Sequence, residues 1–192
     1  MTLLAFALLF VAVIAGYALN LFAAGQIRSR GERLHSLAGY HGAYSALVIG
    51  VPGAILIILW LVLQGPMIDR SVMAGLPAGS MEGLEGGAVD LVLAEIKSIA
   101  GGQVFGTPED WKLAAAETLK ERNASATLAM AIVAALMSAA LLALARSRVS
   151  AGFRARQGVE RIVLGLMIAC STIAIFTTVG IVLSLVFESI KF

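Results

Sequence analysis

The spacing of the charged residues constrains this chain more than any other feature of the sequence. Four long stretches contain no Asp, Glu, Lys or Arg: residues 1–27, 34–68, 123–145 and 162–187. About 20 apolar residues in a helix suffice to cross the hydrocarbon core of a bilayer. Only 14% of the chain is charged, against about 25% in soluble domains. The pattern excludes a soluble domain, a disordered segment and a disulfide-stapled module. It predicts an all-α, polytopic membrane protein with four transmembrane helices and a partly helical extracytoplasmic excursion.

The four spans are expected at about residues 2–24, 43–64, 125–145 and 162–187. The first is interpreted as a membrane anchor rather than a signal peptide, because no basic residue precedes it and arginines follow it. Pro52 in the second span predicts a kinked or loosened helix. The third span is rich in alanine, which favours close packing against other helices.

The distribution of basic residues predicts the orientation. Eight arginines occupy two short connecting segments: Arg28, Arg30, Arg33, Arg146, Arg148, Arg154, Arg156 and Arg161. The segment 69–122 instead carries nine acidic and five basic residues. Cytoplasmic loops carry the excess of Lys and Arg. We therefore expect both arginine-rich segments, including the loop 147–160, to be cytoplasmic. Residues 65–124 and both termini of this chain are then extracytoplasmic.

The excursion between the second and third spans contains two expected helices. Residues 71–88 are rich in glycine and predict a loop. Apolar residues from Val89 to Ala100 recur at steps of three and four, which indicates an amphipathic helix ending at Gly101-Gly102. Thr107 is then expected to cap a second helix that starts at Pro108. This helix has no breaker before about Arg146, a length of roughly 58 Å.

The sequence contains no recognisable catalytic, cofactor-binding or metal-binding constellation. His35 and His41 lack a third ligand, so interfacial or packing roles are expected for them. Glu82, Glu85 and Asp90 form a candidate cation site on the excursion, but solvated loop charges are favoured. The single cysteine, Cys170, cannot form a disulfide within the chain. No substrate-binding residue can be assigned, and neither a cofactor nor nucleic-acid binding is expected.

The expected spans also lack the ionisable residues that usually mark a translocation pathway. Their polar side chains are candidates for hydrogen bonds between helices: Tyr17, Asn20, Thr172, Thr177 and Thr178. The arginines of residues 146–161 are suited to bind anionic lipid headgroups. An excess of Lys and Arg is also expected of any cytoplasmic loop of a membrane protein. The chemistry of the residues therefore favours a membrane-embedded scaffold or sensor module over an enzyme.

Two segments resemble a known family. Residues 33–60, RLHSLAGYHGAYSALVIGVPGAILIILW, are similar to the N-terminal part of PstC-type permease subunits of bacterial phosphate ABC transporters. Ala38 stands where a proline is usual, and His41 stands where an aromatic residue is usual. Residues 159–192, VERIVLGLMIACSTIAIFTTVGIVLSLVFESIKF, resemble the first core helix of the same permeases.

The resemblance implies phosphate import across the bacterial inner membrane. It implies a PstA-type permease, two PstB-type ATPase subunits and a periplasmic phosphate-binding protein as partners, with ATP hydrolysis on the separate ATPase. Residues 1–146 are then expected to form an accessory N-terminal membrane domain, and 161–192 the first helix of the permease core, truncated. Family members continue past the equivalent of Phe192, so we expect a piece of a longer subunit or a split permease. No transport-pathway residue is carried over.

Two other classes remain open from the sequence. The long helix that enters the membrane would suit a membrane sensor with an extracytoplasmic interaction loop. Such a sensor needs an output domain on the cytoplasmic side. A small structural membrane protein would self-associate without ATP-binding partners.

Overall fold

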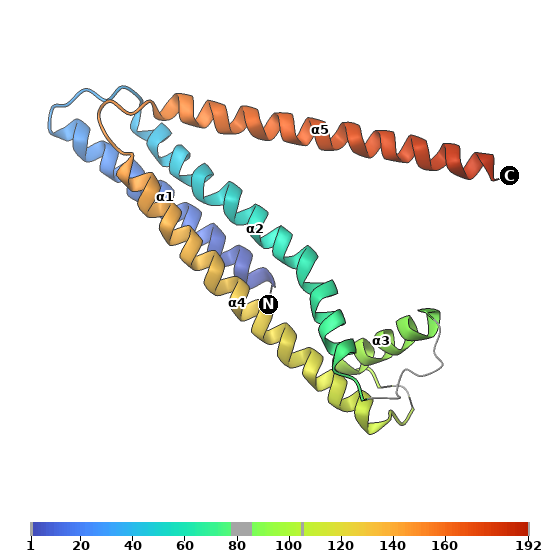
Figure 1. Ribbon diagram of the computed structural model, residues 1–192. Coiled ribbons are helices and arrows are strands. Elements are labelled where there is room, and N and C mark those ends of the chain that lie inside the picture. Colours follow the sequence, from blue (N-terminus) through green and yellow to red (C-terminus); the bar gives the residue numbers. More distant parts are fainter. Residues whose placement is uncertain (1, 78–85, 105, 192) are drawn as a thin grey trace. The chain divides into compact units, whose positions relative to one another are not determined.

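The computed structural model describes residues 2–77, 86–104 and 106–191, and these ranges contain helices and no strand (Figure 1). The helices are α1 (Thr2–Ser29), α2 (Ala38–Ala74), α3 (Gly86–Ala100), α4 (Asp110–Ser147) and α5 (Ala155–Ile190). All except α3 are long and apolar enough to cross a membrane, with a mean hydropathy of 2.3 to 2.8 over their most apolar 18 residues. The predicted all-α class with four membrane helices is confirmed.

The second membrane helix is longer than its uncharged run. α2 contains both Pro52 and Pro66 and continues to Ala74. A proline removes one backbone donor and can bend a helix, but neither proline ends this one. The loop expected over residues 71–88 is therefore helical at both of its ends, because α3 already begins at Gly86. Residues 78–85 lie outside the described ranges.

α4 confirms the single long helix but not its expected start. The helix begins at Asp110, two residues after Pro108. The backbone N–H groups of Lys112 and Leu113 donate to the carbonyl oxygen of Glu109, so the expected cap at Thr107 is wrong. From Asp110 the helix runs through 38 residues to Ser147, or about 57 Å.

The chain forms two compact units. Unit 1 comprises residues 1–11 and 51–140, and unit 2 comprises residues 12–50 and 141–192. α1, α2 and α4 contribute residues to both units, α3 belongs to unit 1, and α5 belongs to unit 2.

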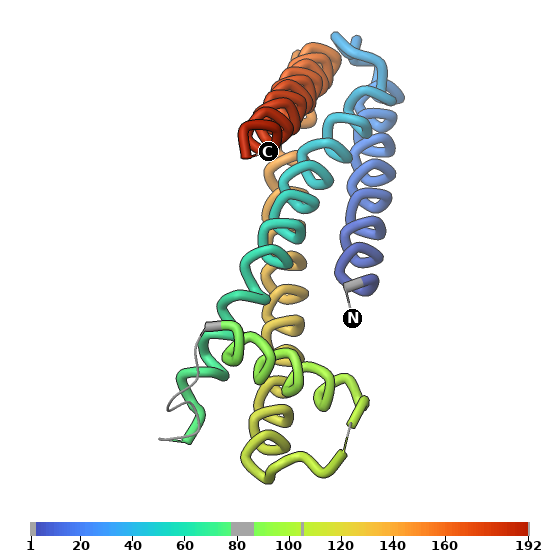
Figure 2. Tube along the Cα trace, turned by 90° about the vertical axis from the view of Figure 1, so that its right-hand side faces the viewer, coloured from blue at the N-terminus to red at the C-terminus, as the bar shows by residue number. Residues whose placement is uncertain are grey.

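Unit 1 contains an apolar core where α3 lies across the end of α2 and the start of α4 (Figure 2). α3 turns the apolar face predicted from its sequence toward this core, and Ile96 is fully buried. The helix ends as expected at the double glycine, where Gly102 has a φ of 86°, a conformation that L side chains rarely adopt. The core comprises Ile68, Val72, Ile96, Ile99, Ala115, Ala116 and Leu119.

Unit 2 packs its helices closely through small residues. A Cβ atom at Gly16 of α1 would lie 2.5 Å from Cδ1 of Ile49 on α2. A Cβ atom at Gly42 of α2 would lie 2.9 Å from Cδ2 of Tyr17 on α1. Glycine at these positions lets the two helices approach, as small residues commonly do in membrane proteins.

α5 differs from the other membrane helices in its surroundings. Its first residue, Ala155, is fully buried, and the helix then extends away from the rest of unit 2 (Figure 1). The described residues bury none of its most apolar 18 residues, against 22% in α1, 17% in α2 and 22% in α4. The described part of the chain therefore holds α5 at its start and leaves its apolar length uncovered.

Candidate functional site

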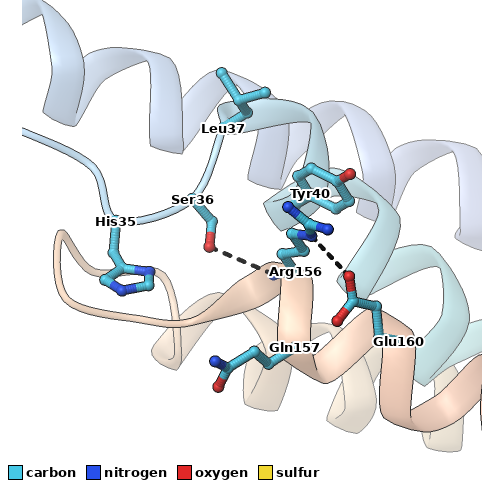
Figure 3. Close-up of a pocket in the computed structure, with 7 residues that line it drawn as sticks. All are labelled: His35, Ser36, Leu37, Tyr40, Arg156, Gln157 and Glu160. Atoms are coloured by element: carbon cyan, nitrogen blue, oxygen red, sulfur yellow. Dashed lines mark hydrogen bonds and ion pairs between the residues drawn. The ribbon is translucent and has the colours of Figure 1, made fainter.

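The junction at which α5 begins forms a polar site in unit 2. A pocket of about 380 Å³ lies between the segment before α2 and the first turns of α5, and Figure 3 shows the side chains around it. The pocket is lined by His35, Ser36, Leu37, Tyr40, Arg156, Gln157 and Glu160.

Hydrogen bonds tie the two sides of this junction together. The backbone N–H of Arg156 donates to Oγ of Ser36 over 3.4 Å, which satisfies one of the free donors at a helix start. The backbone N–H of His35 donates to the carbonyl oxygen of Ala151 over 2.9 Å. The Arg156 guanidinium pairs with Glu160 over 2.7 Å on α5 itself. The segment before α2 thereby holds the beginning of α5 in place.

Aromatic packing reinforces the junction. The ring of Phe153 lies 5.8 Å from that of His41 and 5.0 Å from that of Tyr44, measured between ring centroids. A Cβ atom at Gly158 would lie only 2.8 Å from the Tyr44 ring, so α5 can pack here only with glycine at this position.

The two histidines do not form a site together. His41 is buried with no hydrogen-bond partner on either ring nitrogen among the described residues, and it packs against Phe153. His35 is exposed and lines the pocket. No group of three or more His, Cys, Asp or Glu side chains that could hold a metal ion occurs in the described ranges.

Unit 1 carries a second polar cluster around its apolar core. Lys97 of α3 pairs with Asp69 of α2 over 2.7 Å. Lys112 of α4 pairs with Glu95 of α3 over 2.8 Å and lies 5.4 Å from the ring centroid of Trp111. These pairs connect α3 to both neighbouring helices. The pair between Lys97 and Asp69 is partly exposed, and a pair of this kind contributes at most about 1 kcal/mol.

The acidic site considered from the sequence cannot be assembled from the described residues. Asp90 lies on α3 and forms neither an ion pair nor a side-chain hydrogen bond with any of them. Glu82 and Glu85 lie outside the described ranges. Cys170 is an exposed free thiol on α5.

The hydrogen bonds expected between membrane helices are found, in the described part of the chain, at only one of the candidate positions. Nδ2 of the buried Asn20 donates to Oγ of Ser45 on α2 over 2.8 Å. Tyr17 instead packs against Gly42. The three threonines donate to carbonyl oxygens four residues earlier in α5, so the expectation of interhelical bonds from them is wrong within this chain. These residues are Thr172, Thr177 and Thr178.

The residues predicted from the sequence did not include Ser45, Ser36 and Gly158. Ser45 lies in the GAYSAL segment together with Gly42, Ala43 and Ala46, and such small residues are typical of contact between membrane helices. Ser36 and Gly158 are far apart in the sequence, and nothing local marks them as neighbours of the same junction.

The geometry of this junction positions a helix and assembles no reactive group from the described residues. The ion pair between side chains here joins two residues of the same helix, and the buried contacts are aromatic. The site therefore bears on how membrane helices are arranged.

The comparisons with known proteins address the family. No curated protein and no solved structure matches the chain significantly. A family model described as phosphate ATP-binding cassette transporter matches residues 6–177, a range that includes all four membrane helices in whole or in part. Together with the multi-pass membrane architecture, this match shows that the chain belongs to the phosphate ATP-binding cassette transporter family.

Proposed function

We propose that this chain is the N-terminal membrane part of a phosphate import permease subunit. Residues 1–146 form an accessory membrane domain that supports assembly, and residues 161–192 contribute the first helix of the permease core. The observation that carries the proposal is the uncovered apolar length of α5, in contrast to three membrane helices that are partly buried within the chain.

The surface of α5 supports packing against another subunit. A Cβ atom added at Gly165 or Gly180 would meet no neighbouring atom within 4 Å, so the backbone of a second helix can approach there. Large side chains such as Phe176, 73% exposed, extend between them. We propose that a PstA-type permease covers part of this surface.

The junction supports the accessory role. Contacts at Ser36, Tyr44 and Phe153 hold the start of α5. A small change in direction at the first turn of a helix is amplified along its length. The accessory domain would thus determine where the first core helix enters the permease.

The remaining partners follow from the family. Two PstB-type ATPase subunits would hydrolyse ATP in the cytoplasm, and a periplasmic phosphate-binding protein would deliver phosphate. The chain itself would catalyse no reaction. The arginines near the ends of α1 and α4 support a cytoplasmic location for the segment after α1 and for the loop 147–160. The subunit itself would lie in the bacterial inner membrane. Residues 65–124 and both ends of this chain would then be periplasmic.

Photo-crosslinking in native membranes tests the packing of α5. A photoreactive amino acid in place of Phe176 or Leu183, both exposed on α5, is expected to form an adduct with a second permease subunit. The exposed Phe10 of α1 provides the comparison site. Adducts from Phe10 but from neither α5 position would contradict the proposed packing.

In-frame deletion of residues 2–146 from the native gene tests the accessory role. We expect less assembled transporter in the membrane and a matching loss of phosphate uptake. Immunoblotting of the truncated subunit separates poor assembly from poor expression. Unchanged assembly and uptake would refute an accessory role.

Cysteine labelling tests the orientation in a Cys170→Ala background. A cysteine at Gln103 is expected to react with an impermeant reagent added to the periplasmic side, and a cysteine at Ser150 is expected to be protected. The reverse pattern would overturn the orientation and leave the family unaffected.

A further inference from the structure

An apolar groove runs along the second half of α1. It has a volume of about 640 Å³, and we call it the α1 groove. Its α1 residues include Ala18, Leu21, Gly25 and Ser29, which are three or four positions apart and therefore share one face of the helix. Phe22 stands 69% exposed beside it. The α1 groove is lined by Ala18, Leu21, Phe22, Gly25, Gln26, Ser29 and Ala38.

A basic pocket adjoins one end of this groove. The Arg28 pocket has a volume of about 540 Å³ and shares Ala38 with the α1 groove. Arg28 and Arg33 supply positive charge, and Glu32 supplies a carboxylate. Its lining residues are Arg28, Gly31, Glu32, Arg33, Leu34, His35, Ser36, Leu37 and Ala38.

The two arginines of this pocket have no partner within the described part of the chain. Neither Arg28 nor Arg33 takes part in an ion pair or a side-chain hydrogen bond there. Arg156, by contrast, pairs with Glu160 at the neighbouring junction. The Arg28 pocket thus offers two guanidinium groups with no direct ion-pair partner among the described residues, and such groups suit the bidentate recognition of a phosphate group.

The sequence places this pair of cavities across the membrane surface. The uncharged run ends at Ile27, so the α1 groove belongs to the apolar part of α1 and the Arg28 pocket to the polar boundary. A negative group bound here also lies close to the C-terminal end of α1, where the helix dipole alone would repel it. The positive charges of the two arginines offset this repulsion.

From this arrangement we propose that the α1 groove and the Arg28 pocket together bind one anionic phospholipid. An acyl chain lies along α1 beside Phe22, and the phosphate group of the lipid contacts Arg28 and Arg33. Free phosphate is also a negatively charged oxyanion, but it would use only the polar pocket. The apolar groove that continues from this pocket favours the lipid.

Native mass spectrometry of the full-length protein in detergent, titrated with phosphatidylglycerol or phosphatidylcholine, tests the site. Each basic residue near an anionic surface strengthens binding about fivefold. We expect phosphatidylglycerol to bind about 25-fold more weakly to the double variant Arg28→Gln/Arg33→Gln. The double variant Arg70→Gln/Arg122→Gln, which changes two exposed arginines outside both cavities, is the matched control and is expected to bind normally.

A second variant tests the groove without removing charge. No described atom lies within 4 Å of a Cβ position at Gly25, so Gly25→Leu adds an apolar side chain to the groove from a position with open space around its Cβ atom. It is expected to weaken phosphatidylglycerol binding, while the equally unhindered Gly165→Leu on α5 is not.

Three results would overturn the proposal. Equal affinity for phosphatidylcholine would exclude an anionic headgroup site. Full binding by both the arginine variant and Gly25→Leu would exclude this location. Displacement of the lipid by millimolar inorganic phosphate, with no effect of Gly25→Leu, would assign the pocket to a free oxyanion instead.

Discussion

Removal of the central side chain of α3 gives the most direct test of the unit 1 core. Ile96 is fully buried between α2 and α4. Truncation of a buried isoleucine to alanine costs about 2–5 kcal/mol, because apolar contacts are lost and a cavity remains. For Ile96→Ala we expect α3 to be destabilised by about 3 kcal/mol. Leu91 lies on the same helix but is 72% exposed, so Leu91→Ala should cost less than about 0.5 kcal/mol.

Hydrogen exchange measures this loss locally. A destabilisation of about 3 kcal/mol raises the population of the open form about 150-fold. Amide exchange over α3 should therefore accelerate by about this factor in Ile96→Ala, while amides in α5 keep their rates. The core assignment would be refuted if Ile96→Ala accelerated exchange over α3 no more than Leu91→Ala does.

Two further perturbations address unit 2. A double-mutant cycle with Asn20→Val and Ser45→Ala, with unfolding measured in mixed micelles, should give a coupling energy of about 0.6 kcal/mol. This value is typical of hydrogen bonds between membrane helices. A coupling energy of zero would mean that the bond is absent. Gly158→Leu should displace the start of α5 from Tyr44 and reduce transporter assembly, measured by native gel electrophoresis. An equal loss in Gly87→Leu on α3, where an added Cβ atom meets no described atom within 4 Å, would show that the effect is not specific to the junction.

The number and type of helices were predictable because the interactions that form them are local. A run such as residues 162–187 without a charge can lie in a bilayer only if every backbone group is satisfied within the helix. The apolar spacing from Val89 to Ala100 likewise predicted α3, since its period is that of a helix with one buried face.

Helix ends were predicted less well. α2 passes through Pro66 to Ala74, and α4 begins at Asp110 rather than Pro108. At such boundaries, the local preferences of the sequence to continue a helix and to end it are similar in free energy. The core formed by Ile68 and Val72 with α3 stabilises the extra turns of α2, and this contribution is invisible in the local sequence.

The partners of polar residues were predictable only in part. Asn20 stood out as a lone amide in an apolar run, but its partner Ser45 lies 25 residues away. The threonines of α5 were equally suited to such bonds by their sequence, yet they bond to their own helix, because the apolar length of α5 is not covered by the rest of the chain.

The charge-free runs and the apolar spacing were sufficient to predict four membrane-crossing helices and an amphipathic helix between the second and third. These patterns reflect a local balance between backbone hydrogen bonding and a nonpolar solvent, so they can be interpreted without the tertiary structure. The core that α3 forms with α2 and α4, and the contact between Gly158 and Tyr44, became known only from the structure. The structure also showed that the described part of the chain leaves the apolar length of α5 uncovered. These features depend on which surfaces of distant segments fit together, and shape complementarity between distant segments leaves no periodic trace in the sequence.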